Sequence, residues 1–197
     1  MISFFQPTAS ALTDYVQAQR TLPFTYPAIG HTHDGLMPVK GYDNDVNRIY
    51  LGHGRAVFEA AKQSVRQWKM FPAPWTFIYP DTAPITPGTT VAMCARVFGL
   101  WWRNACSIVY VIDEPDRFGF AYGTLPGHVE RGEELFFVEM DDREDVWYHI
   151  RAFSRPRHWV ARLGYPFVRH YQRKFARDSK NHFLQSLKRE SPQRSFL

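Results

Sequence analysis

The sequence has few of the features that mark membrane or secreted proteins. No apolar run among its 197 residues approaches the roughly 18 residues that a membrane-spanning helix requires. The first residues, MISFFQPTASALTDYV, lack the basic segment and long apolar stretch of a secretory signal. The two cysteines, Cys94 and Cys106, have no metal-type spacing, and free thiols are the usual state in a reducing compartment. We therefore expect a cytoplasmic protein.

Motifs for metals, cofactors and nucleophiles are also weak. His31 and His33 resemble a metal pair, but no third or fourth ligand follows at a usable spacing. The GHG segment at 52–54 lacks the lysine of a P-loop and the full dinucleotide fingerprint, which favours a simple turn. Ser154 has no nucleophile-elbow context. We expect neither a metal centre nor a cofactor, and no catalytic residue can be assigned.

Aromatic residues are abundant, with 16 Phe, 10 Tyr and 6 Trp. Such side chains bury large areas, so they either fill a thick core or line a wide, stiff cavity. The length fits one domain with a substantial core. We treat residues 1–197 as a single domain and expect a poorly ordered tail after about residue 188.

Positive charge is concentrated near the C-terminus. Residues 155–197 contain 11 Lys and Arg against 2 Asp and Glu, whereas residues 1–154 contain 13 against 17. This asymmetry indicates either a solvated helix face or attraction to an anionic surface, with a membrane preferred to nucleic acid as the partner. On the second interpretation, we expect four largely exposed arginines to contact that surface: Arg162, Arg169, Arg173 and Arg177.

The first third of the chain predicts two helices and a strand. Residues Leu12 to Arg20 suit a short helix capped by Ser10 or Thr13. The alternation in Asp45–Leu51 predicts a strand. An apolar stripe predicts an amphipathic helix over Gly54–Trp68, which ends before two prolines.

The central part of the chain alternates with period two. Tight turns separate the segments, and sequential short strands favour an antiparallel meander of about six or seven strands. The expected strands are Trp75–Tyr79, Thr89–Phe98, Ser107–Ile112, Phe118–Tyr122, Glu134–Met140 and Asp145–Phe153.

The last element is predicted to be a long helix from about Arg157 to Leu187, kinked near Pro166. Its aromatic and aliphatic residues recur every three or four positions, so this face must pack on the sheet. We therefore predict an α+β fold in which a strongly bent antiparallel sheet grips the C-terminal helix on its concave face.

The segment over residues 117–139 carries the most specific information. Its first strand has a small-residue face made of Gly119, Ala121 and Gly123. Glycine in a strand usually means that something approaches the backbone closely, which here leaves the long helix, a ligand or a sharp bend of the sheet.

The predicted loop Gly123–Glu133 is longer than a hairpin needs, and long loops are often functional. His128 beside a carboxylate suits proton transfer near neutral pH. Alternatively, Glu133 or Glu134 pairs with Arg151 or Arg155 and fixes the loop. The candidate ligand-binding residues are Tyr122, His128, Glu133, Glu134 and Arg151.

Several blocks of the sequence resemble the DUF1990 family, also called UPF0548. They are YPAIG at 26–30, GYDND at 41–45, LGHG at 51–54, FGFAYGTLPGHVERGEELFFVE at 118–139, AFSRP at 152–156 and ARLGYPFVRHYQRKF at 161–175. The resemblance implies a distant branch of the START and Bet v 1-like (SRPBCC) helix-grip proteins, whose cavity between sheet and helix often takes apolar ligands. It implies no catalytic residue, because the family is named for its unknown function.

Three functions remain open from the sequence. The first is binding or transport of a small, largely apolar ligand between sheet and helix. The second is an enzyme that uses the same cavity, with His128, Glu133 and Glu134 as polar groups. The third is a peripheral membrane or polyanion-binding protein that acts through the basic C-terminal helix.

Overall fold

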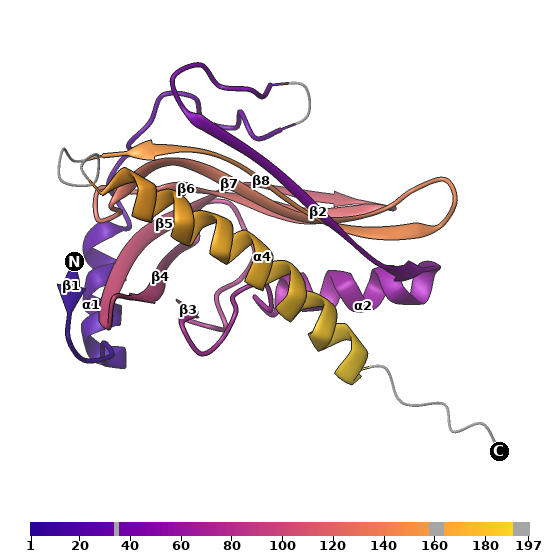
Figure 1. Ribbon diagram of the computed structural model, residues 1–197, viewed down its shortest axis with the longest axis horizontal. Coiled ribbons are helices and arrows are strands. Elements are labelled where there is room, and N and C mark those ends of the chain that lie inside the picture. The colour runs from indigo at the N-terminus through magenta and orange to yellow at the C-terminus, as the bar shows by residue number, and fades with distance from the viewer. Residues whose placement is uncertain (34–35, 158–163, 191–197) are drawn as a thin grey trace.

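A curved antiparallel sheet and a long helix that runs diagonally across it dominate the computed structural model (Figure 1). The structure describes residues 1–33, 36–157 and 164–190. The helices are α1 (Ala9–Gln19), α2 (Arg55–Arg66) and α4 (Tyr165–Glu190). The α+β helix-grip fold expected from the sequence is confirmed.

The sheet contains eight strands, and every pairing is antiparallel. Its path runs β2-β8-β7-β6-β5-β4-β3, and β1 pairs with β5 beside this path. The two-residue β1 is too short to show any periodicity, which explains the lower number expected from the sequence. The strands are β1 (Ile2–Ser3), β2 (Asp43–His53), β3 (Thr76–Tyr79), β4 (Thr90–Val97), β5 (Leu100–Glu114), β6 (Arg117–Thr124), β7 (Glu130–Met140) and β8 (Asp145–Pro156).

Two details of the helices differ from expectation. Thr8 caps α1, because its hydroxyl oxygen accepts the N–H of Ala11 at 3.3 Å. Ser10 and Thr13 lie inside the helix, where the Thr13 hydroxyl donates to the carbonyl of Ala9 at 3.0 Å. Pro166 lies in the first turn of α4, where its missing N–H breaks no hydrogen bond within the helix. The described helix therefore has no earlier turn that Pro166 could kink. The expected helical residues 158–163 lie outside the described residues.

The C-terminal half of α4 is anchored on the sheet by buried aromatic packing. The rings of Phe183 and Tyr148 stack with centroids 4.3 Å apart, and both side chains are fully buried. The Tyr148 hydroxyl also lies 3.0 Å from the hydroxyl of Ser179. Helix α2, which contacts α4, contributes Phe58 and Val65 to the same core.

A polar clasp joins α4 to β2, which is an edge strand of the sheet. Three alternate residues in the first half of β2 take part. Tyr165 donates to Asp43 at 2.7 Å, Arg169 donates to both carboxylate oxygens of Asp45 at 2.6 and 2.8 Å, and Lys180 donates to Asn47 at 3.2 Å. We call these three contacts the β2 clasp.

On the small-residue face of β6, Gly123 is explained by the N-terminal segment. At Gly119 the close neighbour is β7, since a Cβ there would lie 2.2 Å from the carbonyl oxygen of Phe136. A Cβ at Gly123 would lie 2.1 Å from the hydroxyl oxygen of Tyr26 and 2.9 Å from a ring carbon of Phe24. The close neighbour is therefore the chain around residue 25, which covers the outer side of the sheet (Figure 1). The close approach at Gly123 is therefore made by the N-terminal segment, and not by the long helix, a ligand or a sharp bend of the sheet.

Among the residues that the structure describes, no helix is both long and apolar enough to cross a membrane.

We expect Phe183→Ala to lower the free energy of unfolding by about 3–5 kcal/mol, because it leaves a cavity in the anchor between α4 and the sheet. Phe5→Ala is the matched control, since Phe5 is 85% exposed, and should change stability by no more than about 0.5 kcal/mol. Equal losses in the two variants, measured by chemical denaturation, would contradict this role of Phe183.

Candidate functional site

A cavity of about 1140 Å³ lies between the sheet and the N-terminal half of α4. All eight strands supply residues to its wall, and α4 closes the opposite side. The lining is mainly apolar, and its large side chains include Trp75, Trp102, Tyr122, Ile150, Phe167, Tyr171 and Phe175. This volume is slightly above the roughly 300–1,000 Å³ that is typical of small-molecule sites.

Aromatic contacts hold α4 at both ends of the cavity. Phe175 of α4 packs against Phe71 and Phe136, with ring centroids 5.6 and 6.3 Å apart. Tyr171 and Phe167 lie nearer the start of the helix and pack against Phe98 of the β4–β5 turn. Their ring centroids lie 5.4 and 5.6 Å from that of Phe98. The helix is therefore held at both ends of the cavity, and the space between them stays open.

Glu134 and Tyr122 form the first polar pair in the wall. They are cross-strand neighbours on β7 and β6, and the Tyr122 hydroxyl donates to Oε2 of Glu134 at 3.0 Å. Burial raises the pKa of Glu134 to about 8, although the bond from Tyr122 opposes this shift. Glu134 is therefore largely protonated near neutral pH and can donate as well as accept a proton.

Glu130 forms a second polar group, four residues before Glu134 on the same face of β7. Its Oε1 accepts a hydrogen bond from Nε2 of Gln172 at 2.5 Å, and the same amide donates to the hydroxyl of Ser154 at 2.9 Å. Burial raises the pKa of Glu130 to about 7, and Arg169 opposes the shift. Glu130 and Gln172 were not among the candidate site residues, because the two meet only when α4 crosses β7.

His128 lies in the cavity wall but does not form the expected proton-transfer pair. Its Nδ1 accepts the backbone N–H of Glu130 at 2.9 Å. Burial lowers the pKa of His128 to about 3, so the ring is neutral at physiological pH. The surrounding connection is short, since β6 ends at Thr124 and β7 begins at Glu130. The prediction of a long loop over Gly123–Glu133 is therefore wrong, because most of these residues belong to β6 or β7.

Glu133 has a structural role on the outer side of the sheet. Its carboxylate accepts hydrogen bonds from the Tyr26 hydroxyl at 2.7 Å, the Gly30 N–H at 2.8 Å and the Thr32 N–H at 3.0 Å, and also from the Thr32 hydroxyl. These bonds hold the N-terminal segment against β7. Glu133 is therefore bound by the N-terminal segment, and not by Arg151 or Arg155 as one alternative from the sequence expected.

The two candidate arginines of β8 stack on aromatic rings. Arg151 lies 4.9 Å from the ring centroid of Phe137, and Arg155 lies 4.6 Å from that of Tyr42. Arg151 alternates along β8 with Ile150 and Ala152, which line the cavity, so it faces the other side of the sheet. Of the five candidate ligand-binding residues, Tyr122, His128, Glu133 and Glu134 line the cavity and Arg151 does not. The carboxylate of Glu133 is bound by the N-terminal segment, so Tyr122, His128 and Glu134 are the candidates left to face a ligand.

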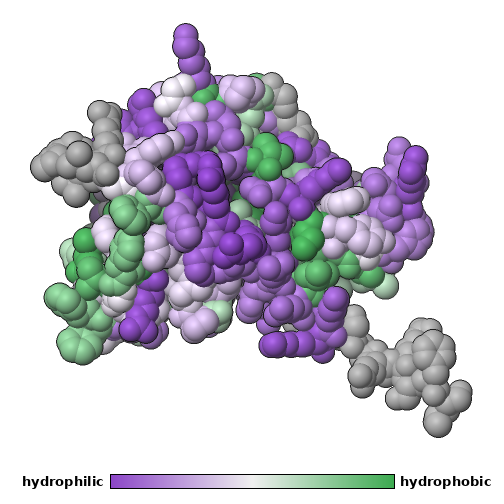
Figure 2. Space-filling model, viewed as in Figure 1, coloured by the Kyte–Doolittle hydropathy of each residue, from purple (hydrophilic) through white to green (hydrophobic). Residues whose placement is uncertain are grey.

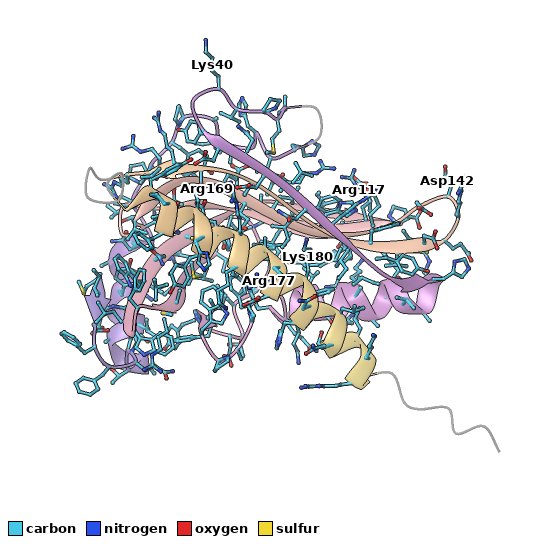
Figure 3. All side chains as sticks on the ribbon, in the orientation of Figure 1. Lys40, Arg117, Asp142, Arg169, Arg177 and Lys180 are labelled. Carbon is cyan, nitrogen blue, oxygen red and sulfur yellow. The ribbon has the colours of Figure 1, made fainter. Side chains whose placement is uncertain are left out.

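The basic residues of α4 differ in their surroundings (Figure 3). The expectation that Arg169 is largely exposed is wrong, because its side chain is 15% exposed and bound to Asp45 in the β2 clasp. Arg173 and Arg177 are exposed, and Arg177 pairs with Asp178 at 3.2 Å. Arg162 lies outside the described residues. Contact of these arginines with an anionic surface stays a prediction.

Comparison with known proteins places the sequence in a family. The family model described as "Domain of unknown function (DUF1990)" matches residues 25–182. A UPF0548 protein of Dictyostelium discoideum is 32% identical over 207 aligned positions, which cover 95% of this chain and 96% of the relative. A UPF0548 protein of Deinococcus radiodurans is 36% identical over 183 positions, covering 87% and 91% of the two chains.

Solved structures share the fold at low sequence identity. The hypothetical protein jhp0584 of Helicobacter pylori superposes with a TM-score of 0.54 and 11% identity, covering 83% of this chain and 95% of that protein. The protein Ara h 8.0201 gives a TM-score of 0.47 with 13% identity, covering 74% and 99% of the two chains. The likeness to the Helicobacter protein shows a common fold.

Glu133→Ala should lower the free energy of unfolding by roughly 3 kcal/mol, because buried donors around residues 26–32 lose their acceptor and each such loss costs roughly 1–3 kcal/mol. Glu59→Ala on the exposed side of α2 is the matched control and should be nearly neutral. Urea unfolding curves of the two variants provide the measurement. A loss below about 1 kcal/mol for Glu133→Ala would show that the N-terminal segment is held by other contacts.

The pKa of Glu134 also predicts a pH dependence of stability. The folded chain holds this proton up to about pH 8, whereas an unfolded glutamate loses it near 4.5, so Glu134 reduces stability as pH rises through this window. His128 acts in the opposite sense below about pH 6.5, because its proton binds only in the unfolded chain. We therefore expect the free energy of unfolding to decline from about pH 6.5 to 8, and less steeply in Glu134→Gln.

Denaturant titrations at several pH values measure this difference between the two proteins. Glu59→Gln should give a curve parallel to that of the unchanged protein, since Glu59 is exposed on α2. If Glu134→Gln is also parallel, the carboxyl of Glu134 is not the group that titrates in this range.

Proposed function

We propose that this chain, which belongs to the DUF1990 family, binds or transports a small, largely apolar ligand in the cavity between the sheet and α4. The observation that carries the proposal is the cavity itself, about 1140 Å³ in volume and walled mainly by aromatic and aliphatic side chains. A few polar groups, centred on Glu134 and Glu130, supply the orientation that such pockets usually provide.

An apolar rim supports entry of such a ligand. Phe98 and Phe167 line the cavity and are 64% and 58% exposed, with their rings 5.6 Å apart. Met1 and Ile2 line it as well and are also exposed. Figure 2 shows a hydrophobic area at the end of the molecule where the N-terminal segment lies. An apolar molecule that reaches this end of the protein meets a surface of its own polarity before it enters the cavity.

Glu134 favours an enzyme as the second candidate function. A carboxyl with its pKa raised to about 8 beside a tyrosine hydroxyl is suited to general acid–base catalysis near neutral pH. In an enzyme, Glu134→Gln would abolish turnover while a bound substrate analogue is retained. In a binding protein, the same variant would change only affinity.

The binding proposal predicts saturable uptake of one neutral apolar fluorophore, such as N-phenyl-1-naphthylamine, for each chain. Ala152→Phe projects a ring from β8 into the cavity and should weaken binding about tenfold or more, which corresponds to about 1.4 kcal/mol. Ala95→Phe, on β4, is a second cavity-filling position. Fluorescence titration gives both the stoichiometry and the affinity.

Ala18→Phe is the matched control, because Ala18 is exposed on α1 and remote from the cavity lining. It should bind the fluorophore as the unchanged protein does. Unsaturable binding, or equal affinity in folded Ala152→Phe and Ala95→Phe proteins, would contradict a ligand site in this cavity.

A further inference from the structure

The part of the cavity wall that β7 supplies is acidic. Glu130 and Glu134 lie four residues apart on β7, on the same face of the strand, and both line the cavity. Gly132 lies between them on this face and must remain a glycine, because a Cβ there would lie 2.0 Å from the carbonyl oxygen of Phe153. The wall between the two carboxyls is therefore bare backbone, which leaves room for a ligand group beside either of them.

Neither carboxyl has a strong basic partner in the described ranges 1–33, 36–157 and 164–190. Arg169, whose charge influences Glu130, donates to both carboxylate oxygens of Asp45 in the β2 clasp, and Glu130 is bound by the neutral amide of Gln172. Glu134 is bound by the neutral hydroxyl of Tyr122. The described part of the chain thus gives Glu134 no ion pair.

The groups around Glu134 add no positive charge from the sheet. Those that face it or influence it from the neighbouring strands are neutral or acidic: Tyr122 of β6, Tyr148 of β8, Cys106 of β5, Asp45 of β2 and Glu130 of β7 itself. The ring of His128 is neutral as well.

The basic residues that line the cavity come from α4. Lys180 is engaged by Asn47, Arg177 pairs with Asp178, and Arg173 is exposed. They lie on the helix, across the cavity from β7, so the two sides of the cavity differ in charge. The β7 wall is where an electropositive group of a ligand would be stabilised.

We propose that the cavity takes an apolar molecule that ends in an amine, with the ammonium group placed on Glu134 and the Tyr122 hydroxyl and the apolar body among the aromatic side chains. This inference rests on the proposed binding function and names the class of ligand. An anionic end placed on the β7 wall would lie beside two carboxyls, which is repulsive once either is ionised. A neutral end would form hydrogen bonds with the protonated carboxyl, without the charge attraction that an ammonium group gains from a carboxylate.

Proton release follows from this arrangement. An ammonium group next to Glu134 favours its ionised form, so the protonated carboxyl becomes a carboxylate and its proton passes to the solvent. The complex then contains an ammonium–carboxylate pair, and total charge is conserved by the released proton. Up to one proton per bound amine is expected near neutral pH, because Glu134 is largely protonated before binding.

Three probes that differ only at their polar end test the inference: decylamine, decanol and decanoate. Each is titrated calorimetrically into the full chain near pH 7, in two buffers of different ionisation enthalpy. We expect decylamine to bind about tenfold or more tightly than decanol, with decanoate weakest and proton release confined to the amine. Glu134→Gln should abolish the proton release and bring the affinity for decylamine down to that for decanol.

Tyr122→Phe keeps the ring and the carboxyl and should reduce the amine preference only in part. Glu59→Gln, the same substitution on the exposed side of α2, should leave all three affinities unchanged. Decanol affinity equal to that of decylamine, or an amine preference retained in Glu134→Gln, would overturn the inference and leave the binding function in place. Failure of all three probes to bind would overturn the binding function together with the inference.

Discussion

The contact between α4 and the sheet at one end of the helix determines most of what lies around it. Phe183 stacks on Tyr148, and Leu187 is also buried, so the last turns of α4 are fixed on the sheet. Phe175 closes this packed region against Phe71 and Phe136. Because the helix is straight and the sheet curves away from it, the first half of α4 cannot fill the same space (Figure 1). The cavity follows from this difference in shape.

β7 shows how the same strand serves two purposes. Glu130 and Glu134 face the cavity, whereas Glu133 on the opposite face holds the N-terminal segment through Tyr26, Gly30 and Thr32. Two adjacent glutamates are thereby given different environments by the pleat alone. One carboxylate is saturated with donors and stabilises the fold, and the other is left with a single neutral donor and the open cavity.

The sequence predicted the features that depend on local periodicity. The series of strands and the long helix were recognised because alternation and three- to four-residue spacing are local signals. The pairing of β2 with β8 joins residues about a hundred positions apart, which no local pattern encodes. For the same reason, the burial of Arg169 could not be anticipated, because it depends on Asp45 lying next to α4. Glu133 and Glu134 were both candidates, and only the register of β7 with β6 decides which one faces inwards.

The β2 clasp has a consequence for how the protein behaves in a crowded solution. β2 ends the sheet, and an uncovered edge strand offers free backbone groups with which another chain can pair. Asp43, Asp45 and Asn47 hold α4 through polar side chains rather than apolar ones. Charged side chains on an edge strand are one of the devices that discourage another chain from pairing with it. Asp43 and Asp45 therefore disfavour edge-to-edge aggregation at β2 as well as binding the helix.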